Sequence, residues 1–129
     1  MPVRSLNSPV LKWPDARTVD HAVRRWAERV AAAHPEVAAL GYFGSYARGD
    51  WGPGSDLDIV MVVQSSEEVF ARRAARWDTT ELPVPADLLV YTREEWRNLD
   101  RAGRFYREVA KKTVWVWSSP EVTAPFSQR

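Results

Sequence analysis

Hydrophobic and polar positions along the chain form two patterns, a helical period and continuous apolar runs typical of buried strands. Between residues 19 and 33 apolar side chains recur every three or four positions, with charged residues on the other face, which predicts an amphipathic helix. Continuous apolar runs predict buried strands over 37–43 and 56–63. A third strand is predicted after a proline-containing stretch and ends at Tyr91, and a fourth covers 113–117.

Capping residues predict where the helices begin. Thr18 can cap the first helix, and 45–48 open a short helix directly after the first strand. Serine or threonine followed three residues later by glutamate forms a capping box, as at Ser65 and Thr92. The remaining predicted helices cover 65–77, 93–101 and 104–112. The first of these is expected to bury Val69, Phe70, Ala74 and Trp77.

This order of elements predicts an α+β fold, with a small mixed sheet of about four strands and helices packed mainly on one face. A chain of 129 residues is expected to form one domain. Residues 1–17 contain several prolines and no period, so we expect an irregular arm there and a loose tail over 118–129. The domain itself is predicted over 18–117.

Composition narrows the function classes. The absence of cysteine excludes disulfides and thiolate metal sites and suits a reducing cytoplasm. No apolar run reaches the roughly 18 residues of a membrane span, so no membrane association is expected. The formal net charge of +1 gives no indication of nucleic-acid binding.

The segment after the first predicted strand has the residues of a phosphate site. Gly44 permits a tight turn and a close approach of the backbone, and Ser45 offers a hydroxyl at the start of a helix, where free N–H groups favour an anion. Arg48 lies on the same side of that turn. It can contact phosphate, or it can form a salt bridge with Asp50 or Asp56. Residues 49–54 are rich in glycine and read as a loop.

Two aspartates stand at the start of the second predicted strand. Alternate strand residues point to the same face, so Asp56 and Asp58 lie side by side, roughly 6–7 Å apart at the backbone. Their mutual repulsion calls for a positive partner, and a divalent metal ion is the natural candidate. The alternative is an edge strand with two solvated carboxylates, but it leaves the upstream Gly-Ser-x-x-Arg-Gly unexplained.

The stretch Gly44-Ser-x-Ala-Arg-Gly, followed by Ser55-Asp-x-Asp, resembles the signature of the DNA-polymerase-β-like nucleotidyltransferases, and the short chain is similar to their minimal nucleotidyltransferase (MNT) branch. The resemblance covers residues 19–117 and implies a polymerase-β palm-like fold. It implies that Gly44, Ser45, Arg48 and Ser55 bind the nucleotide.

The resemblance also implies a third carboxylate on a neighbouring strand, which completes the metal site and takes a proton from the attacking hydroxyl. Asp87 precedes Leu88-Leu89-Val90 much as Asp58 precedes Ile59-Val60, so Asp87 is the candidate. An aspartate that only marks the start of a strand after Pro85 is the alternative. Glu81 and Asp78 are the fallback candidates, although neither lies in a strand-like run.

The function that the resemblance implies is transfer of a nucleoside monophosphate, with AMP from ATP favoured, to a hydroxyl. One or two Mg²⁺ ions would be held by Asp56, Asp58 and Asp87. The alternative is a non-catalytic nucleotide-binding or antitoxin-like interaction module of the same fold.

The resemblance further implies a partner, because MNT proteins of this size are commonly paired with a small helical HEPN protein that can be an RNase toxin. A tyrosine of that toxin would be the acceptor. A homo-oligomer is considered as well, since a dimer could supply the acceptor wall that the short chain lacks. The docking surface is expected at Trp115 and Trp117 or on an arginine stripe at 72, 73 and 76, unless the tryptophans form core and the arginines a solvated helix face.

Overall fold

The structure, a computed structural model, describes residues 13–120. Its helical segments are α1 (Ala16–Ala33), α2 (Ser45–Arg48), α3 (Phe70–Arg73), η2 (Ala74–Arg76), α4 (Arg93–Arg97), α5 (Arg104–Glu108) and η3 (Ala110–Lys112). Its strands are β1 (Val37–Phe43), β2 (Leu57–Val63), β3 (Ala86–Thr92) and β4 (Val114–Ser118). The described residues therefore form an α+β fold with one four-stranded mixed sheet, as predicted.

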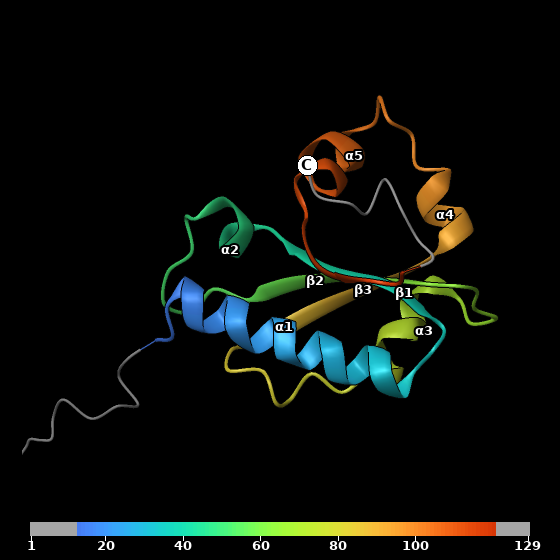
Figure 1. Cartoon of the computed structure of the whole chain (residues 1–129). Helices are drawn as coiled ribbons and strands as arrows, with labels where there is room; N and C mark the ends of the chain where they lie inside the picture. The colour runs from blue at the N-terminus through green and yellow to red at the C-terminus, as the bar shows by residue number, and fades with distance from the viewer. Residues whose placement is uncertain (1–12, 121–129) are drawn as a thin grey trace, which may run out of the picture.

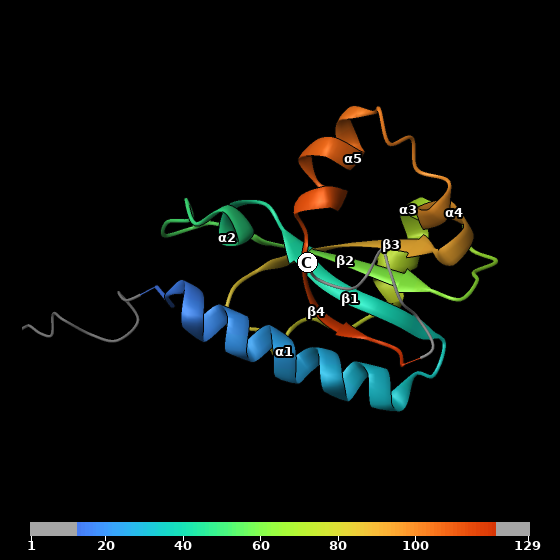
Figure 2. The ribbon, with the colours of Figure 1, turned by 45° about the horizontal axis from the view of Figure 1, so that its top comes forward.

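The sheet has the strand order β3-β2-β1-β4 (Figures 1 and 2). β1 runs antiparallel to both β2 and β4, whereas β2 and β3 run parallel. As a result, the carboxyl end of β1 lies beside the amino ends of the other three strands. The register pairs Phe43 with Asp58, Asp58 with Asp87, and Tyr42 with Val114 at this end of the sheet.

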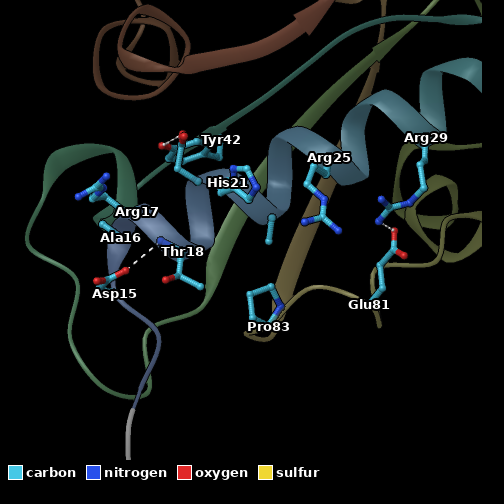
Figure 3. Close-up of a pocket in the computed structure, with 12 residues that line it drawn as sticks. Asp15, Ala16, Arg17, Thr18, His21, Arg25, Arg29, Tyr42, Glu81 and Pro83 are labelled. Carbon is cyan, nitrogen blue, oxygen red and sulfur yellow. Dashed lines mark hydrogen bonds and ion pairs between the residues drawn. The ribbon is translucent and has the colours of Figure 1, made fainter.

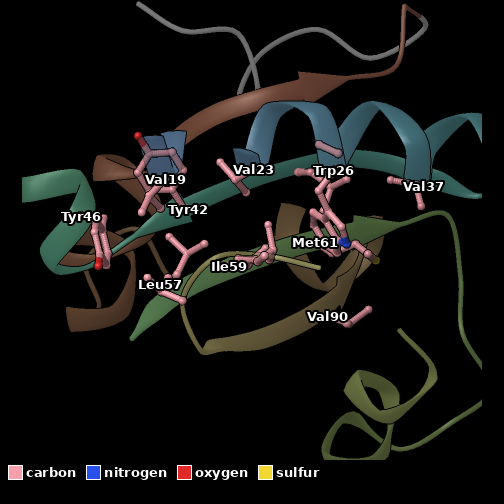
Figure 4. Close-up of a cluster of buried hydrophobic side chains, with 14 of the residues drawn as sticks. Val19, Val23, Trp26, Val37, Tyr42, Tyr46, Leu57, Ile59, Met61 and Val90 are labelled. Atoms are coloured by element: carbon pink, nitrogen blue, oxygen red, sulfur yellow. The ribbon is translucent and has the colours of Figure 1, made fainter. Parts of the chain in front are cut away.

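Apolar residues cover both faces of the sheet. On one face α1 packs its buried side chains, among them Val23 and Trp26, against strand residues such as Ile59 and Met61 (Figure 4). On the other face a smaller cluster gathers Ala38, Ala39, Val60, Val62, Trp96, Ala110 and Trp115.

The helices lie on both faces rather than mainly on one, with α1 on one side and α4 and α5 on the other (Figure 1). β1 and β2 are apolar at successive positions, so each strand presents hydrophobic side chains to both faces, and both faces must be covered.

The helix predicted over 65–77 is wrong in extent. Only α3 and the single turn of η2 are helical, and the Ser65 capping box does not form, because Ser66 instead accepts a hydrogen bond from the Glu68 N–H. Val69 and Phe70, predicted to be buried, are 66% and 42% exposed. The arginine that follows them takes the buried position instead.

That arginine, Arg73, also overturns the predicted arginine stripe, because its side chain is only 8% exposed. It donates two hydrogen bonds to the Glu95 carboxylate, at 2.7 and 3.0 Å, and one to the Val90 carbonyl at 3.0 Å. For the tryptophans the alternative considered from sequence holds, since Trp115 is buried and Trp117 packs against the core. Neither surface is available for docking as predicted.

The remaining boundaries shift by a few residues. Asp15, not Thr18, caps α1, because its carboxylate accepts a hydrogen bond from the Thr18 N–H at 2.9 Å. The capping box of Thr92 and Glu95 forms as predicted, but α4 ends at Arg97. Most of the predicted arm over 1–17 and tail over 118–129 lies outside the described residues.

Among residues 13–120, no helix has the length and apolar character needed to cross a membrane.

Candidate active site

One cavity of about 570 Å³ lies at the end of the sheet where β1 stops and the other strands start. All seven residues that the sequence analysis selected line it, and the structure adds Phe43 and three residues of the α5–η3 segment. The full lining is Phe43, Gly44, Ser45, Arg48, Ser55, Asp56, Asp58, Asp87, Glu108, Val109 and Lys112.

Gly44 brings the backbone directly against the carboxylate of Asp58. Its φ of +80° and ψ of −150° belong to a region that side chains rarely adopt. A Cβ at this position would collide with the Asp58 Oδ2 atom. Only glycine therefore permits both the turn from β1 into α2 and the close approach to the aspartate.

The carboxylates of Asp58 and Asp87 project from directly paired positions of two parallel strands. Burial raises the pKa of Asp58, and the negative charges of Asp87 and Asp56 raise it further. Alternate residues of β2, such as Ile59, face the core under α1, so Asp58 faces the opposite side, where the cavity lies. The site thus holds crowded, partly desolvated negative charge.

The donor set fits a magnesium ion together with a nucleotide. Among the charged groups that line the cavity are four carboxylates and two cations, a formal balance of −2. Within residues 13–120, no three histidine, cysteine, aspartate or glutamate side chains converge closely enough to hold a metal ion by themselves. Mg²⁺ is usually bound by one or two carboxylates plus substrate phosphates rather than by an all-protein cage, so this arrangement suits it.

The other predicted nucleotide contacts have defined partners. Arg48 donates to Asp50 at 3.1 Å, and both side chains are more than half exposed, so the salt bridge considered from sequence is present. Such an exposed pair is weak, and the guanidinium can exchange it for a phosphate. Ser55 accepts a hydrogen bond from the Gly52 N–H at 2.9 Å and so orders the loop that leads to Asp56.

The fallback carboxylates lie elsewhere. Asp78 accepts hydrogen bonds from the N–H and the hydroxyl of Thr80, and Glu81 pairs with Arg29 at 2.7 Å. Glu81 lines a larger cavity, of about 950 Å³, against α1 (Figure 3). That cavity contains none of the predicted site residues. Size alone therefore does not mark the candidate active site.

Sequence reasoning missed Glu108, Val109 and Lys112. Their predicted helix carried no motif, and their place in the site depends on the pairing of β4 with β1. Because Val114 pairs with Tyr42, the residues just before β4 must lie beside the end of β1. A pattern within 104–112 could not have supplied this information.

A family model described as the nucleotidyltransferase domain matches residues 23–116, most of the chain. This chain belongs to the nucleotidyltransferase domain family. The match includes all the residues proposed from sequence and the α5–η3 segment. A comparison with curated proteins finds no match.

Solved structures share the nucleotidyltransferase fold. A protein from Sulfolobus solfataricus, described as a "putative nucleotidyltransferase", is 23% identical with a TM-score of 0.58, over 80% of this chain and 83% of that chain. A toxin–antitoxin structure with AMP-PNP is 18% identical with a TM-score of 0.53, over 76% of this chain and 75% of that chain. A mutant of the toxin–antitoxin MntA-HpeT is 16% identical, with a TM-score of 0.52 and the same coverage. At these identities the likeness shows the fold alone.

Proposed function

We propose that this nucleotidyltransferase domain transfers a nucleoside monophosphate, AMP from ATP, to a hydroxyl group in a Mg²⁺-dependent reaction. The observation that carries the proposal is the single cavity in which the phosphate-site residues and the aspartates of β2 and β3 meet. The family match supports nucleotidyl transfer as the general reaction.

The residues divide between the nucleotide and the acceptor. Gly44, Ser45 and Arg48 would hold the triphosphate, and Asp56 and Asp58 would hold Mg²⁺ against it. When bound, the metal would neutralise phosphate oxygens and make the α-phosphorus easier to attack. Asp87, which is exposed at the edge strand β3, would bind the metal on the acceptor side.

The proposed reaction is a nucleophilic substitution at the α-phosphorus. The acceptor oxygen forms a bond to the α-phosphorus while the bond between the α-phosphorus and the bridging oxygen breaks, and pyrophosphate leaves with that oxygen. Asp87 would accept the proton of the acceptor hydroxyl. The protein would contribute mainly positioning and compensation of charge.

A non-catalytic nucleotide-binding module remains the second candidate, because a site that binds Mg²⁺ and ATP is needed for both functions. The two differ in their products, since only the enzyme releases pyrophosphate.

The partner that we propose is a helical toxin of the HEPN type, with this domain as its antitoxin in the cytoplasm. The likeness to two toxin–antitoxin structures supports this role. A tyrosine hydroxyl of the toxin would be the acceptor. An added AMP would place an anion where RNA phosphate must bind, and charge repulsion would block the RNase.

Melting with ligands tests the function. ATP at about 100 times its dissociation constant stabilises a protein by about 2.7 kcal/mol. We expect this shift with ATP and Mg²⁺ and a much smaller one with ATP and a chelator. Asp58→Asn should lose the shift, whereas Glu67→Gln, an exposed carboxylate outside the cavity, should keep it.

A transfer assay completes the test. Asp87→Asn should retain most of the melting shift but lose transfer and pyrophosphate release, by about 100-fold or more. Equal melting shifts with and without a chelator would contradict the metal site. Normal transfer by Asp87→Asn would remove that residue from the mechanism.

A further inference from the structure

The α5–η3 segment supplies a second wall of the candidate active site. Glu108, Val109 and Lys112 line the cavity together with Ser45 and Arg48, although about 60 residues separate the two groups in sequence. In Figures 1 and 2 the two segments extend from the same end of the sheet. Lys112 is thus a cation in the site that the phosphate motif does not include.

The backbone of Lys112 is firmly placed. Its N–H donates to the Val109 carbonyl at 3.0 Å, and the hydroxyl of the buried Thr113 donates to the same carbonyl at 3.0 Å. Ala110 is buried, and β4 begins at Val114 in register with β1. Lys112 therefore lines the cavity from a backbone position that is fixed to the sheet.

The side chain of Lys112, in contrast, is weakly held. Its Nζ atom lies 3.5 Å from Glu108 Oε1, and the two side chains are 55% and 58% exposed. An exposed pair at this spacing contributes little to stability, so the ammonium group can turn to a stronger anion at small cost. Glu108, which also lines the cavity, is its partner in this structure.

The charges at the site explain why the phosphates of a nucleotide would attract the Lys112 ammonium group. Four carboxylates and two cations line the cavity, and a nucleoside triphosphate brings further negative charge. The bond to the leaving group breaks toward the β-phosphate, so negative charge grows on the pyrophosphate in the transition state. Lysine is a compact cation with three donors and a common phosphate ligand.

We propose that Lys112 binds the β- and γ-phosphates of the nucleotide and stabilises the leaving pyrophosphate, with Glu108 as its resting partner. This inference rests on the proposed function. It makes Lys112 a specificity residue, because it favours a triphosphate over a nucleoside monophosphate. Catalysis and selection of the triphosphate then share one side chain.

The adjacent lysine offers a matched control. Lys111 is exposed, carries the same charge and does not line the cavity. Lys112→Ala, Lys112→Arg and Lys111→Ala are compared by calorimetry with three probes: ATP with Mg²⁺, pyrophosphate with Mg²⁺, and AMP. Circular dichroism checks that each variant is folded.

Lys112→Ala should weaken the binding of ATP and pyrophosphate roughly 10- to 100-fold, as expected for loss of a charged hydrogen bond. Binding of AMP should change less than about twofold, because AMP lacks the two outer phosphates. Lys112→Arg should recover most of the affinity, and Lys111→Ala should behave as wild type. In a transfer assay Lys112→Ala should lower kcat.

Two results overturn the inference: equal effects of Lys112→Ala and Lys111→Ala on ATP, or an equal loss of ATP and AMP by Lys112→Ala. A wild-type protein that binds no ATP with Mg²⁺ overturns both this inference and the proposed function. A protein that binds ATP but releases no pyrophosphate contradicts the transfer function only. In that case a selective loss of ATP binding in Lys112→Ala still supports the phosphate contact.

Discussion

At the scale of single residues, Gly44 connects backbone conformation to the chemistry of the site. Its positive φ makes the turn out of β1, and its missing side chain leaves room for Asp58. Two independent constraints, conformation and space, thus meet at one position. A substitution there should affect both the fold and the position of the carboxylate.

Gly44→Ala should lower the free energy of unfolding by about 1–3 kcal/mol, the cost of a residue held in a sparsely populated conformation. It should also weaken the melting shift with ATP and Mg²⁺, because the new Cβ displaces Asp58. Gly52→Ala is the control, since a Cβ at Gly52 meets no atom within 4 Å. Chemical denaturation of the three proteins gives the comparison, and a Gly44→Ala protein as stable as Gly52→Ala would contradict the argument.

Most residues of the site could be predicted from the sequence alone, because a short motif contains them. Gly44, Ser45, Arg48, Asp56 and Asp58 lie within 15 consecutive residues that leave one strand and enter the next. The placement of Asp87 needed only the expectation that a neighbouring strand begins at the same edge. Lys112 could not be found in this way, because its position depends on a strand pairing that joins distant parts of the chain.

At the scale of elements, the 64–85 crossover between β2 and β3 departs most from the predicted helix. Periodicity favoured a long helix with a basic outer face. The structure instead turns Arg73 inward, where it joins α3 to β3 and α4 through Val90 and Glu95. Helical periodicity does not distinguish an arginine that faces solvent from a buried arginine that pairs with a carboxylate on another element.

The Arg73–Glu95 pair should make the stability of the fold depend on acidity. The hydrogen bonds from Arg73 lower the pKa of Glu95 from 4.5 to about 2. A lowered pKa in the folded state means that the unfolded state binds the proton more tightly. The contribution is therefore complete above pH 4.5 and is lost as the pH falls toward 2.

Glu95→Gln tests this contribution, since glutamine can still complete the capping box but carries no charge. We expect a loss of about 1.5 kcal/mol at pH 7, the lower end of the range for a charged hydrogen bond, because solvent screens the half-exposed carboxylate. In urea denaturation between pH 7 and pH 2, the free energy of unfolding of Glu95→Gln should depend less on pH than that of the wild-type protein. Glu94→Gln, the exposed neighbour, should leave both values unchanged; an equal effect of the two variants would contradict the pairing.

At the scale of the whole molecule, the strands were predicted well and the covering of the sheet was not. Each strand is an apolar run whose type can be read locally, and the four runs gave the four strands. Which face of the sheet a helix covers depends on the side on which the chain passes between two strands, and local patterns do not show this. Trp115 and Trp117 illustrate the difficulty, because alternation along β4 would put both on one face. Instead, Trp115 packs with Trp96 and Ala110, whereas Trp117 packs against the cluster under α1, and the pairing of β4 with β1 is irregular between them.

The size of the cavity also limits how an acceptor can reach the site. The cavity is bounded by α2, the strand ends and the α5–η3 segment, and its volume of about 570 Å³ lies within the ordinary range for small-molecule sites. A nucleotide can occupy much of such a space, so a macromolecular acceptor must present its hydroxyl from outside. This agrees with the proposed protein partner, which would reach Asp87 at the exposed edge strand β3.

We therefore expect AMP to be added to the partner when the two proteins meet. Co-expression with a helical HEPN-type protein, chosen from the genes that adjoin the one for this chain, followed by intact mass measurement, should show a mass increase of that protein by whole AMP units. The increase should disappear in the Asp56→Asn, Asp58→Asn double variant, because two of the three carboxylates that would hold Mg²⁺ are lost. It should persist in Glu67→Gln, whose charge lies outside the cavity. Absence of both an adduct and co-purification would reject the toxin partner and favour a small molecule or nucleic acid as the acceptor.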